Sequence, residues 1–245
     1  MTRSPVLDWL LLFAALGCYW LFLKGRLADR FGVSARGRRA LYRFWVVKSA
    51  VLFIAPALVI LAILGRGEAL FAMPDIFAVA AGTLGLVPGG LARDTAFLLT
   101  VAGGLFGGAL LGALMAQWRR RRGRAPWMMG NLRAVLPGKR GDLPAAAAVA
   151  LAAGVSEELF FRLLLPLLIA LVSGSALLGF VLSALLFVLA HRYQGAIGMI
   201  GSTALALVFT GFYWMTGSLW MTMLLHAAVD LNGLVIRPFV LGIRA

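Results

Sequence analysis

Cysteine, acidic residues and histidine are all scarce in this sequence: its 245 residues include one Cys, nine Asp and Glu together, and two His. The single thiol, Cys18, excludes an intrachain disulfide and any metal site built from several cysteines. Charged residues make up only 13% of the chain and hydrophobic residues 62%, with a mean hydropathy of +0.95. Ordinary soluble domains are about 45–50% apolar. The composition therefore indicates an integral membrane protein.

Long apolar runs recur along the chain, and their patterning is helical rather than alternating. A membrane-spanning helix needs about 20 such residues, and a helix satisfies its own backbone hydrogen bonds in lipid. We therefore predict an all-α fold, a polytopic transmembrane helical bundle of about seven to eight spans. The seven clearest spans are 6–23, 44–64, 95–118, 143–172, 175–191, 195–215 and 218–236. In the fourth, which is too long for one straight crossing, we expect tilt or a kink near Pro166.

The net charge of +14 does not point to a nucleic-acid partner, because basic residues gather between spans. Segment 24–43 holds seven Lys and Arg and segment 119–142 holds eight. Loops rich in Lys and Arg stay on the cytoplasmic side of a membrane. We therefore predict that both segments and the C-terminus are cytoplasmic and that the N-terminus is outside. A weaker reading is that segment 119–142 also contacts anionic lipid head groups.

Segment 69–87 is apolar over nearly a spanning length but is interrupted by Pro74, Asp75 and two glycines. If it crossed the membrane, the next span would place its basic end outside, against the charge rule. We therefore expect a re-entrant or interfacial segment. In the span that follows, we expect the small residues to allow close packing of a neighbouring helix. These residues are Gly103, Gly104, Gly107, Gly108 and Gly112.

Two carboxylates and a guanidinium interrupt the apolar sequence of the fourth span. Glu158 and Arg162 are four residues apart and share a helix face, whereas Glu157 points about 100° away. The spacing predicts one paired acid and one unpaired acid. A structural ion pair between helices is the plain alternative, but ionisable groups inside a membrane segment are commonly functional.

The two histidines lie in the same half of the chain as the glutamate pair. His191 closes one span, and His226 lies in the last, with Asp230 one turn later on the same face. Taken singly, His191 reads as an interfacial anchor and His226 as half of a packed His–Asp pair. Three spans that each place titratable groups at membrane depth instead favour one shared site.

The set Glu157, His191 and His226 has the parts for amide hydrolysis. A carboxylate in a low-dielectric pocket can take a proton from water and later return it, and imidazoles can hold that water or an anionic transition state. The same three groups match a catalytic zinc site with an open position, and spacing alone does not separate the two chemistries. There is no His-Glu-x-x-His, no Gly-x-Ser-x-Gly and no phosphate or dinucleotide fingerprint.

Three ordered motifs resemble those of the CPBP family of intramembrane proteases, which includes the CAAX prenyl endopeptidases and bacteriocin-processing or self-immunity relatives. The motifs are Glu157-Glu158-x-x-x-Arg162, Phe187-x-x-x-His191 and His226-x-x-x-Asp230. The resemblance covers 143–236 and identifies it as a catalytic helical bundle. N-terminal transmembrane helices and basic loops occupy 1–142, and a short tail occupies 237–245.

The resemblance also implies roles for the six residues. Glu157 would be the general base on water with His191 beside it, and Glu158 and Arg162 would support the site. His226 and Asp230 would form the oxyanion side. Leu163 stands where the family commonly has glycine, and Asp230 stands where asparagine is common. An unprotonated aspartate donates no hydrogen bond, so Asp230 cannot donate one to an oxyanion as the amide of an asparagine would.

The leading hypothesis is an intramembrane endopeptidase that cuts near the C-terminal tail of a membrane-associated or lipidated protein or peptide. We expect the protein to lie in the inner membrane of a prokaryotic cell, with its site facing the cytoplasm. We expect it to need no cofactor and to bind no nucleic acid. Its expected partners are the substrate and the lipid bilayer, and no oligomeric state is predicted. If a metal is present, its expected ligands are Glu157, His191 and His226. The alternatives are a proton-coupled transporter that uses the buried Glu, His and Asp, and a scaffold whose charges are purely structural.

Overall fold

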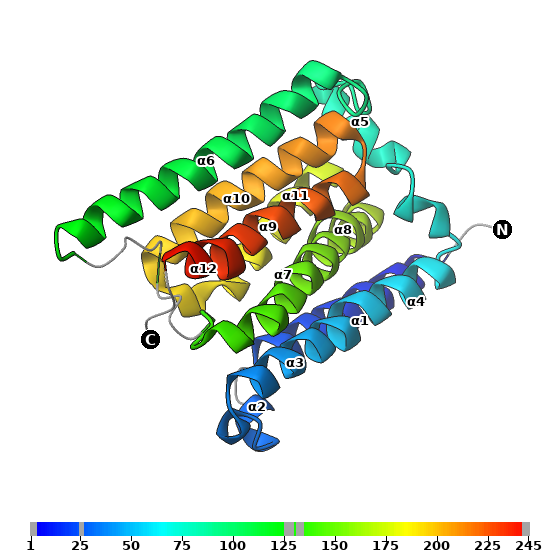
Figure 1. Cartoon of the computed structure of the whole chain (residues 1–245). Helices are drawn as coiled ribbons and strands as arrows, with labels where there is room; N and C mark the ends of the chain where they lie inside the picture. The colour runs from blue at the N-terminus through cyan, green and yellow to red at the C-terminus, as the bar shows by residue number, and fades with distance from the viewer. Residues whose placement is uncertain (1–3, 25–26, 125–129, 131–134, 242–245) are drawn as a thin grey trace.

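The computed structural model describes residues 4–24, 27–124, 130 and 135–241, and this part of the chain contains helices and no strand. The all-α prediction is therefore confirmed. The α-helices are α1 (Pro5–Leu23), α2 (Leu27–Arg30), α3 (Arg38–Ser49), α4 (Ala55–Ile63), α5 (Asp75–Thr83), α6 (Thr95–Arg121), α7 (Leu143–Glu158), α8 (Leu165–Ser173), α9 (Ala176–Ala190), α10 (Gly195–Thr216), α11 (Leu219–Leu231) and α12 (Arg237–Leu241). They form a bundle of long rods (Figure 1).

Five helical stretches of the described residues are long and apolar enough to cross a membrane. They are Pro5–Leu23, Arg38–Ile63, Thr95–Arg121, Arg192–Thr216 and Leu219–Val240. These findings confirm a polytopic membrane bundle. The two other predicted spans coincide with α7–α8, which carries the three ionisable residues, and with α9, an apolar helix of 15 residues. A total of seven crossings stays a prediction.

Three helices contain a π-helical segment, and each segment ends two residues before a proline. The segments are Ala50–Ile54 before Pro56, Leu159–Leu164 before Pro166, and Asn232–Ile236 before Pro238. Proline has no N–H, so the carbonyl that it would bond is left free, and a wider turn accommodates the ring. The irregularity expected near Pro166 is therefore a π segment immediately before it.

The free carbonyl ahead of Pro166 has a replacement donor. The Leu165 N–H donates to the Phe160 carbonyl, five residues back, so the next bond in this register would run from residue 166 to the Phe161 carbonyl. Pro166 cannot make it. The Ser183 hydroxyl of α9 donates to the Phe161 carbonyl instead, at 2.6 Å and in a buried position. The helix that carries the glutamate pair is thereby tied to its neighbour.

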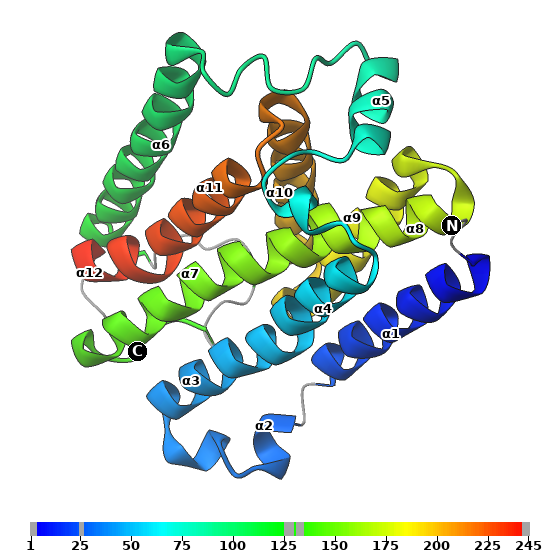
Figure 2. The same ribbon diagram turned by 90° about the vertical axis from the view of Figure 1, so that its right-hand side faces the viewer.

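The rod formed by α7 and α8 lies in the middle of the bundle, between α1, α3 and α4 on one side and α11 on the other (Figure 2). Its leucines and phenylalanines from position 159 to 168 are buried. Close approach depends on two glycines. A Cβ on Gly154 would lie 2.8 Å from the Ala227 nitrogen of α11, and one on Gly179 would lie 2.5 Å from the Pro166 carbonyl oxygen. Small residues therefore let α11 and α9 reach the central rod.

Polar contacts fasten the N-terminal helices to the second half of the chain. The Tyr42 hydroxyl of α3 donates to the Val135 carbonyl at 2.8 Å, and Arg39 Nε donates to Asp142 Oδ1 at 3.2 Å. Asp142 is buried at the start of α7. On α1, the Tyr19 hydroxyl donates to the Leu186 carbonyl of α9 at 2.8 Å. Helices from both halves of the chain thus share one framework.

The ambiguous segment 69–87 does not span the membrane as a helix. Its helix α5 has nine residues, which at about 1.5 Å per residue is far less than a hydrocarbon core of about 30 Å. This short helix agrees with the expectation, and a re-entrant or interfacial position stays a prediction. The expectation of close packing at the α6 glycines is wrong within this chain: a Cβ at any of these five positions would meet nothing within 4 Å. No described part of the chain packs against this face of α6, so small size is not used for packing between described helices there.

Candidate active site

Three separate regions of the bundle bring the six predicted residues together. Glu157 and Glu158 end α7, and Arg162 follows in the π segment; His191 caps the end of α9; His226 and Asp230 lie one turn apart on α11. Gly154 explains how α11 comes so near: its missing side chain leaves room for the backbone around Ala227, the residue after His226.

Glu158 is the centre of a buried network. Its Oε2 lies 3.2 Å from Arg162 Nε, and its Oε1 lies 2.6 Å from His226 Nδ1. The three side chains are 0%, 2% and 4% exposed, in that order. Buried charges need such partners, because an isolated one would be strongly destabilising. The predicted Glu158–Arg162 pair is present, and the contact with His226 was not predicted.

Aromatic rings enclose this network on two sides. The Arg162 guanidinium lies 4.3 Å from the ring centre of Phe187 and 5.4 Å from that of Phe209, within the range of cation–π attraction. Phe209 also stacks on the His226 ring at 4.5 Å with an interplanar angle of 23°. Rings on both sides fix the planes of the guanidinium and the imidazole, so these groups have little freedom to turn.

Glu157 and His191 form a second, more open pair. Their side chains are 15% and 16% exposed, and Glu157 Oε2 lies 3.9 Å from His191 Nε2. Oε2 has no hydrogen-bond partner among the described residues. A separation of 3.9 Å is too long for a direct hydrogen bond and leaves room for a water that contacts both atoms. Glu158 is therefore sealed, whereas the Glu157 side chain is partly exposed although its Oε2 atom is buried.

His191 is oriented by the backbone. Its Nδ1 lies 2.8 Å from the Phe187 carbonyl oxygen, so Nδ1 carries the proton and donates it, which leaves Nε2 of the neutral ring as an acceptor toward Glu157. No acid lies one turn away from His191 in the sequence, so residue identity alone does not show what orients its ring. A main-chain carbonyl one turn back does the same work.

Asp230 is the most exposed of the six side chains, at 29%. Its Oδ2 lies 3.6 Å from His226 Nε2, which is an ion-pair distance rather than a hydrogen bond. The expected packed His–Asp pair within α11 is therefore not the main anchor of His226. The anchor is Glu158 of α7, and Asp230 stays close to the other ring nitrogen while remaining accessible.

The arrangement does not fit the three-ligand zinc site that spacing allowed. No group of three His, Cys, Asp or Glu side chains within the described part of the chain is placed to hold a metal ion. Glu158 occupies Nδ1 of His226, and Asp230 faces its Nε2. Only His191 Nε2 and Glu157 are then left facing each other, one ligand short of a catalytic zinc site. The absence of a cofactor stays a prediction.

Sequence reasoning missed two features of the site. Phe209, on α10, is one apolar residue in an apolar span, so nothing in the sequence singles it out. The contact between Glu158 and His226 joins residues 68 positions apart, and helical spacing carries no information about it. A signal did exist in Gly154, because a glycine four residues, or about one helical turn, before the buried Glu158 marks a place where another helix can approach.

Residues 139–232 match the family model described as Rce1-like, type II CAAX prenyl endopeptidase Rce1-like. The matched stretch contains all six candidate residues and nearly all of the predicted catalytic bundle, so the resemblance to CAAX-type membrane proteases is confirmed for this segment. No curated protein and no solved structure was found to match the chain. The apolar helices indicate an integral membrane protein, and residues 139–232 are similar to this protease family.

Proposed function

We propose, from the similarity of residues 139–232 to the Rce1-like family of type II CAAX prenyl endopeptidases, that this chain hydrolyses a peptide bond near the C-terminal tail of a membrane-associated or lipidated protein. One observation supports the chemistry most directly: Oε2 of the partly exposed Glu157 has no hydrogen-bond partner among the described residues and faces the acceptor nitrogen of His191 at 3.9 Å. The proposal makes Glu157 the base that activates water, with no metal ion required.

Two acceptors on one water would orient it for attack. The neutral His191 ring presents its Nε2 lone pair, because Nδ1–H is donated to the Phe187 carbonyl. A water between the two groups donates one hydrogen to Glu157 and the other to His191, which turns its oxygen lone pairs outward to the substrate. Such positioning lowers the entropy cost of the attack.

In this proposal Glu157 takes a proton from the water and later returns it to the leaving group. As the water oxygen bonds to the scissile carbonyl carbon, one O–H bond breaks and its proton moves to the Glu157 carboxylate. As the C–N bond breaks, the same proton passes to the leaving nitrogen. The products are a new C-terminal carboxylate and a released tail with a free amine, and Glu157 is restored.

His226 is placed to stabilise the oxyanion. Its Nδ1–H is held by Glu158 at 2.6 Å, so a protonated ring presents Nε2–H at the opposite side, next to the accessible Asp230. A donor that is fixed in advance needs no reorganisation when charge develops on the carbonyl oxygen. In this scheme Glu158 and Arg162 position His226 and do not touch the substrate.

The test compares C-terminal peptides in membranes from cells that make wild-type protein, Glu157→Gln or Glu68→Gln. Glu68 is an exposed glutamate outside the site and is the matched control. We expect at least one membrane protein to keep its uncut tail in the Glu157→Gln cells alone. Identical termini in all three samples would contradict the proposal. Identical termini together with a proton flux lost only in Glu157→Gln would favour the transporter.

A further inference from the structure

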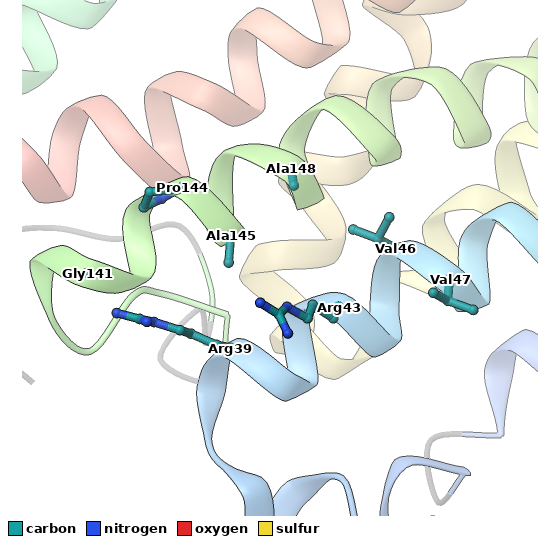
Figure 3. A pocket seen from close by; sticks show the side chains of 8 residues that line it. All are labelled: Arg39, Arg43, Val46, Val47, Gly141, Pro144, Ala145 and Ala148. Carbon is teal, nitrogen blue, oxygen red and sulfur yellow. The ribbon is translucent and has the colours of Figure 1, made fainter.

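A groove of about 610 Å³ lies between α3 and α7, away from the candidate active site (Figure 3). Its lining residues come from α3, from the turn just before α7 and from the first two turns of α7: Arg39, Arg43, Val46, Val47, Gly141, Pro144, Ala145 and Ala148. Both helices begin at the end of the bundle where the basic residues gather, so the groove runs from that end along the helices.

The groove is charged at its mouth and apolar along its length. Figure 3 shows the two arginine side chains reaching from α3 toward the start of α7, with the valines further along α3. Arg39 is held through Nε by Asp142, and a Cβ on Gly141 would collide with its Nη2 atom. Arg43 is exposed and forms no ion pair with any described residue.

The wall on α7 explains why the groove is open. Pro144, Ala145 and Ala148 have short side chains, so they leave unfilled the space that larger residues would occupy beside α3. From Arg39 to Val47 the groove follows α3 for about 12 Å at roughly 1.5 Å per residue. That length suits an extended hydrocarbon chain with a charged group at one end.

We propose that this groove binds one anionic phospholipid, with the headgroup phosphate at Arg39 and Arg43 and an acyl chain along the valines and alanines. The charges match in sign, and a fork of guanidinium N–H groups suits phosphate oxygens. The apolar walls favour a lipid over a soluble anion, which would leave them exposed to water. Lys and Arg near a membrane surface also select the anionic lipids of the cytoplasmic leaflet, the side to which the basic loops are predicted to belong.

The proposal is independent of the protease chemistry. None of the groove residues belongs to the six candidate site residues, and Ala148 precedes Glu157 by about two and a half turns of α7, at 3.6 residues per turn. Lipid binding can therefore be measured on the intact protein without any cleavage assay. The lipid proposal stands if the protease proposal fails, and the reverse is also true.

The experiment counts phospholipids retained on the purified full chain by native mass spectrometry, after extraction from nanodiscs of phosphatidylcholine with a minor share of phosphatidylglycerol. The test variants are Arg39→Gln/Arg43→Gln, which removes the charge, and Ala148→Phe, which fills the groove. Their matched controls are Arg30→Gln/Arg36→Gln, an equal charge loss at exposed positions between α1 and α3, and Ala102→Phe on the exposed face of α6.

We expect one phosphatidylglycerol per wild-type chain in preference to phosphatidylcholine. Loss of both arginines should weaken retention roughly thirtyfold, from about 1 kcal/mol per basic residue near the surface. Ala148→Phe should also lose the lipid, and both controls should keep it. Equal retention in the double variant and its control would overturn the proposal, as would equal binding of phosphatidylcholine. Full competition by glycerophosphoglycerol, which has no acyl chains, would instead show a site for soluble phosphate esters and would equally overturn it.

Discussion

Nδ1 of His226 lies 2.6 Å from Oε1 of Glu158, and this buried contact joins α11 to α7. The other oxygen of the same carboxylate binds Arg162 Nε at 3.2 Å. One sealed carboxylate therefore fixes both a guanidinium and an imidazole, while the side chain of the neighbouring Glu157 is partly exposed and its Oε2 has no hydrogen-bond partner among the described residues. Two adjacent residues of the same type can thus have different work in one site.

The first prediction follows from that difference. Glu157→Gln should abolish cleavage and leave thermal unfolding in detergent unchanged, because the amide cannot take a proton from water. Glu158→Gln should mainly lower stability, on the order of 3–5 kcal/mol, because it leaves Arg162 and His226 without their shared carboxylate. Thermal unfolding of both variants, with Glu68→Gln as control, measures the contrast. An inactive but fully stable Glu158→Gln beside an active Glu157→Gln would reverse the assignment.

The second prediction concerns the close contact of α7 and α11. A methyl group on Gly154 would lie 2.8 Å from the Ala227 nitrogen and 2.9 Å from the Met223 carbonyl oxygen. Backbone atoms cannot yield easily, so Gly154→Ala should lower stability by about 1–3 kcal/mol and weaken activity as His226 moves.

The control for that variant is Gly103→Ala on α6, where a Cβ would meet nothing within 4 Å. Replacing a helical glycine by alanine in open space should stabilise the helix slightly, by about 0.5–1 kcal/mol. Melting temperatures that fall equally in both variants would show that the α7–α11 contact is not the cause.

Much of this arrangement can be predicted from the sequence, because the signals are local. The apolar lengths predict the helices, the basic segments mark their ends, and the spacing of Glu158 and Arg162 predicts their ion pair. Interruption of 69–87 by Pro74 and Asp75 correctly indicates a segment too short to span. Each of these conclusions depends on residues that are neighbours in the chain.

The remaining features of the site depend on which helices contact one another, and local sequence patterns carry no information about those contacts. The α6 glycines look like a packing face, but none of the residues that the structure describes lies within 4 Å of a Cβ placed there. His226 has Asp230 on its own helix, but its hydrogen bond goes to Glu158 on another. His191 has no nearby acid in sequence, but the Phe187 carbonyl serves instead, and a backbone acceptor leaves no trace in residue identity.

The third prediction tests the replacement donor ahead of Pro166. Ser183→Ala removes the buried hydroxyl that donates to the Phe161 carbonyl, and an unsatisfied buried carbonyl costs about 1–3 kcal/mol. Thermal unfolding should show that loss. Thr203→Ala on α10 is the control, since its exposed hydroxyl donates to a carbonyl within its own helix. A Ser183→Ala protein as stable as this control would show that the π segment tolerates a free carbonyl.

The fourth prediction concerns topology. Single cysteines are introduced at Ala35, Arg124 and Arg93 in a Cys18→Ala background, all three at exposed positions. The charge rule predicts that Ala35 and Arg124 face the cytoplasm and that Arg93 faces outward. A membrane-impermeant thiol reagent applied to intact cells should label only the cysteine at Arg93. Labelling of Ala35→Cys or Arg124→Cys before lysis would contradict the orientation.

The last prediction is that cleavage needs no bound metal ion. A catalytic zinc takes three protein ligands and keeps one position open, and each ligand atom must be free to face the ion. Both ring nitrogens of His226 face carboxylates, Glu158 at 2.6 Å and Asp230 at 3.6 Å. His191 Nδ1 donates a hydrogen bond to the Phe187 carbonyl, so only its Nε2 is left to bind a metal ion. Purified active protein should therefore hold less than one zinc per chain by elemental analysis.

Prolonged chelation supplies the functional half of this test, with the substrate found by C-terminal proteomics. Activity should survive, because a water held between Glu157 and His191 needs no Lewis acid to lose its proton to a carboxylate. His191→Gln should then slow cleavage without changing metal content. One zinc per chain, with activity lost on stripping and restored by zinc alone, would mean that His226 turns away from Glu158 to join Glu157 and His191 as ligands.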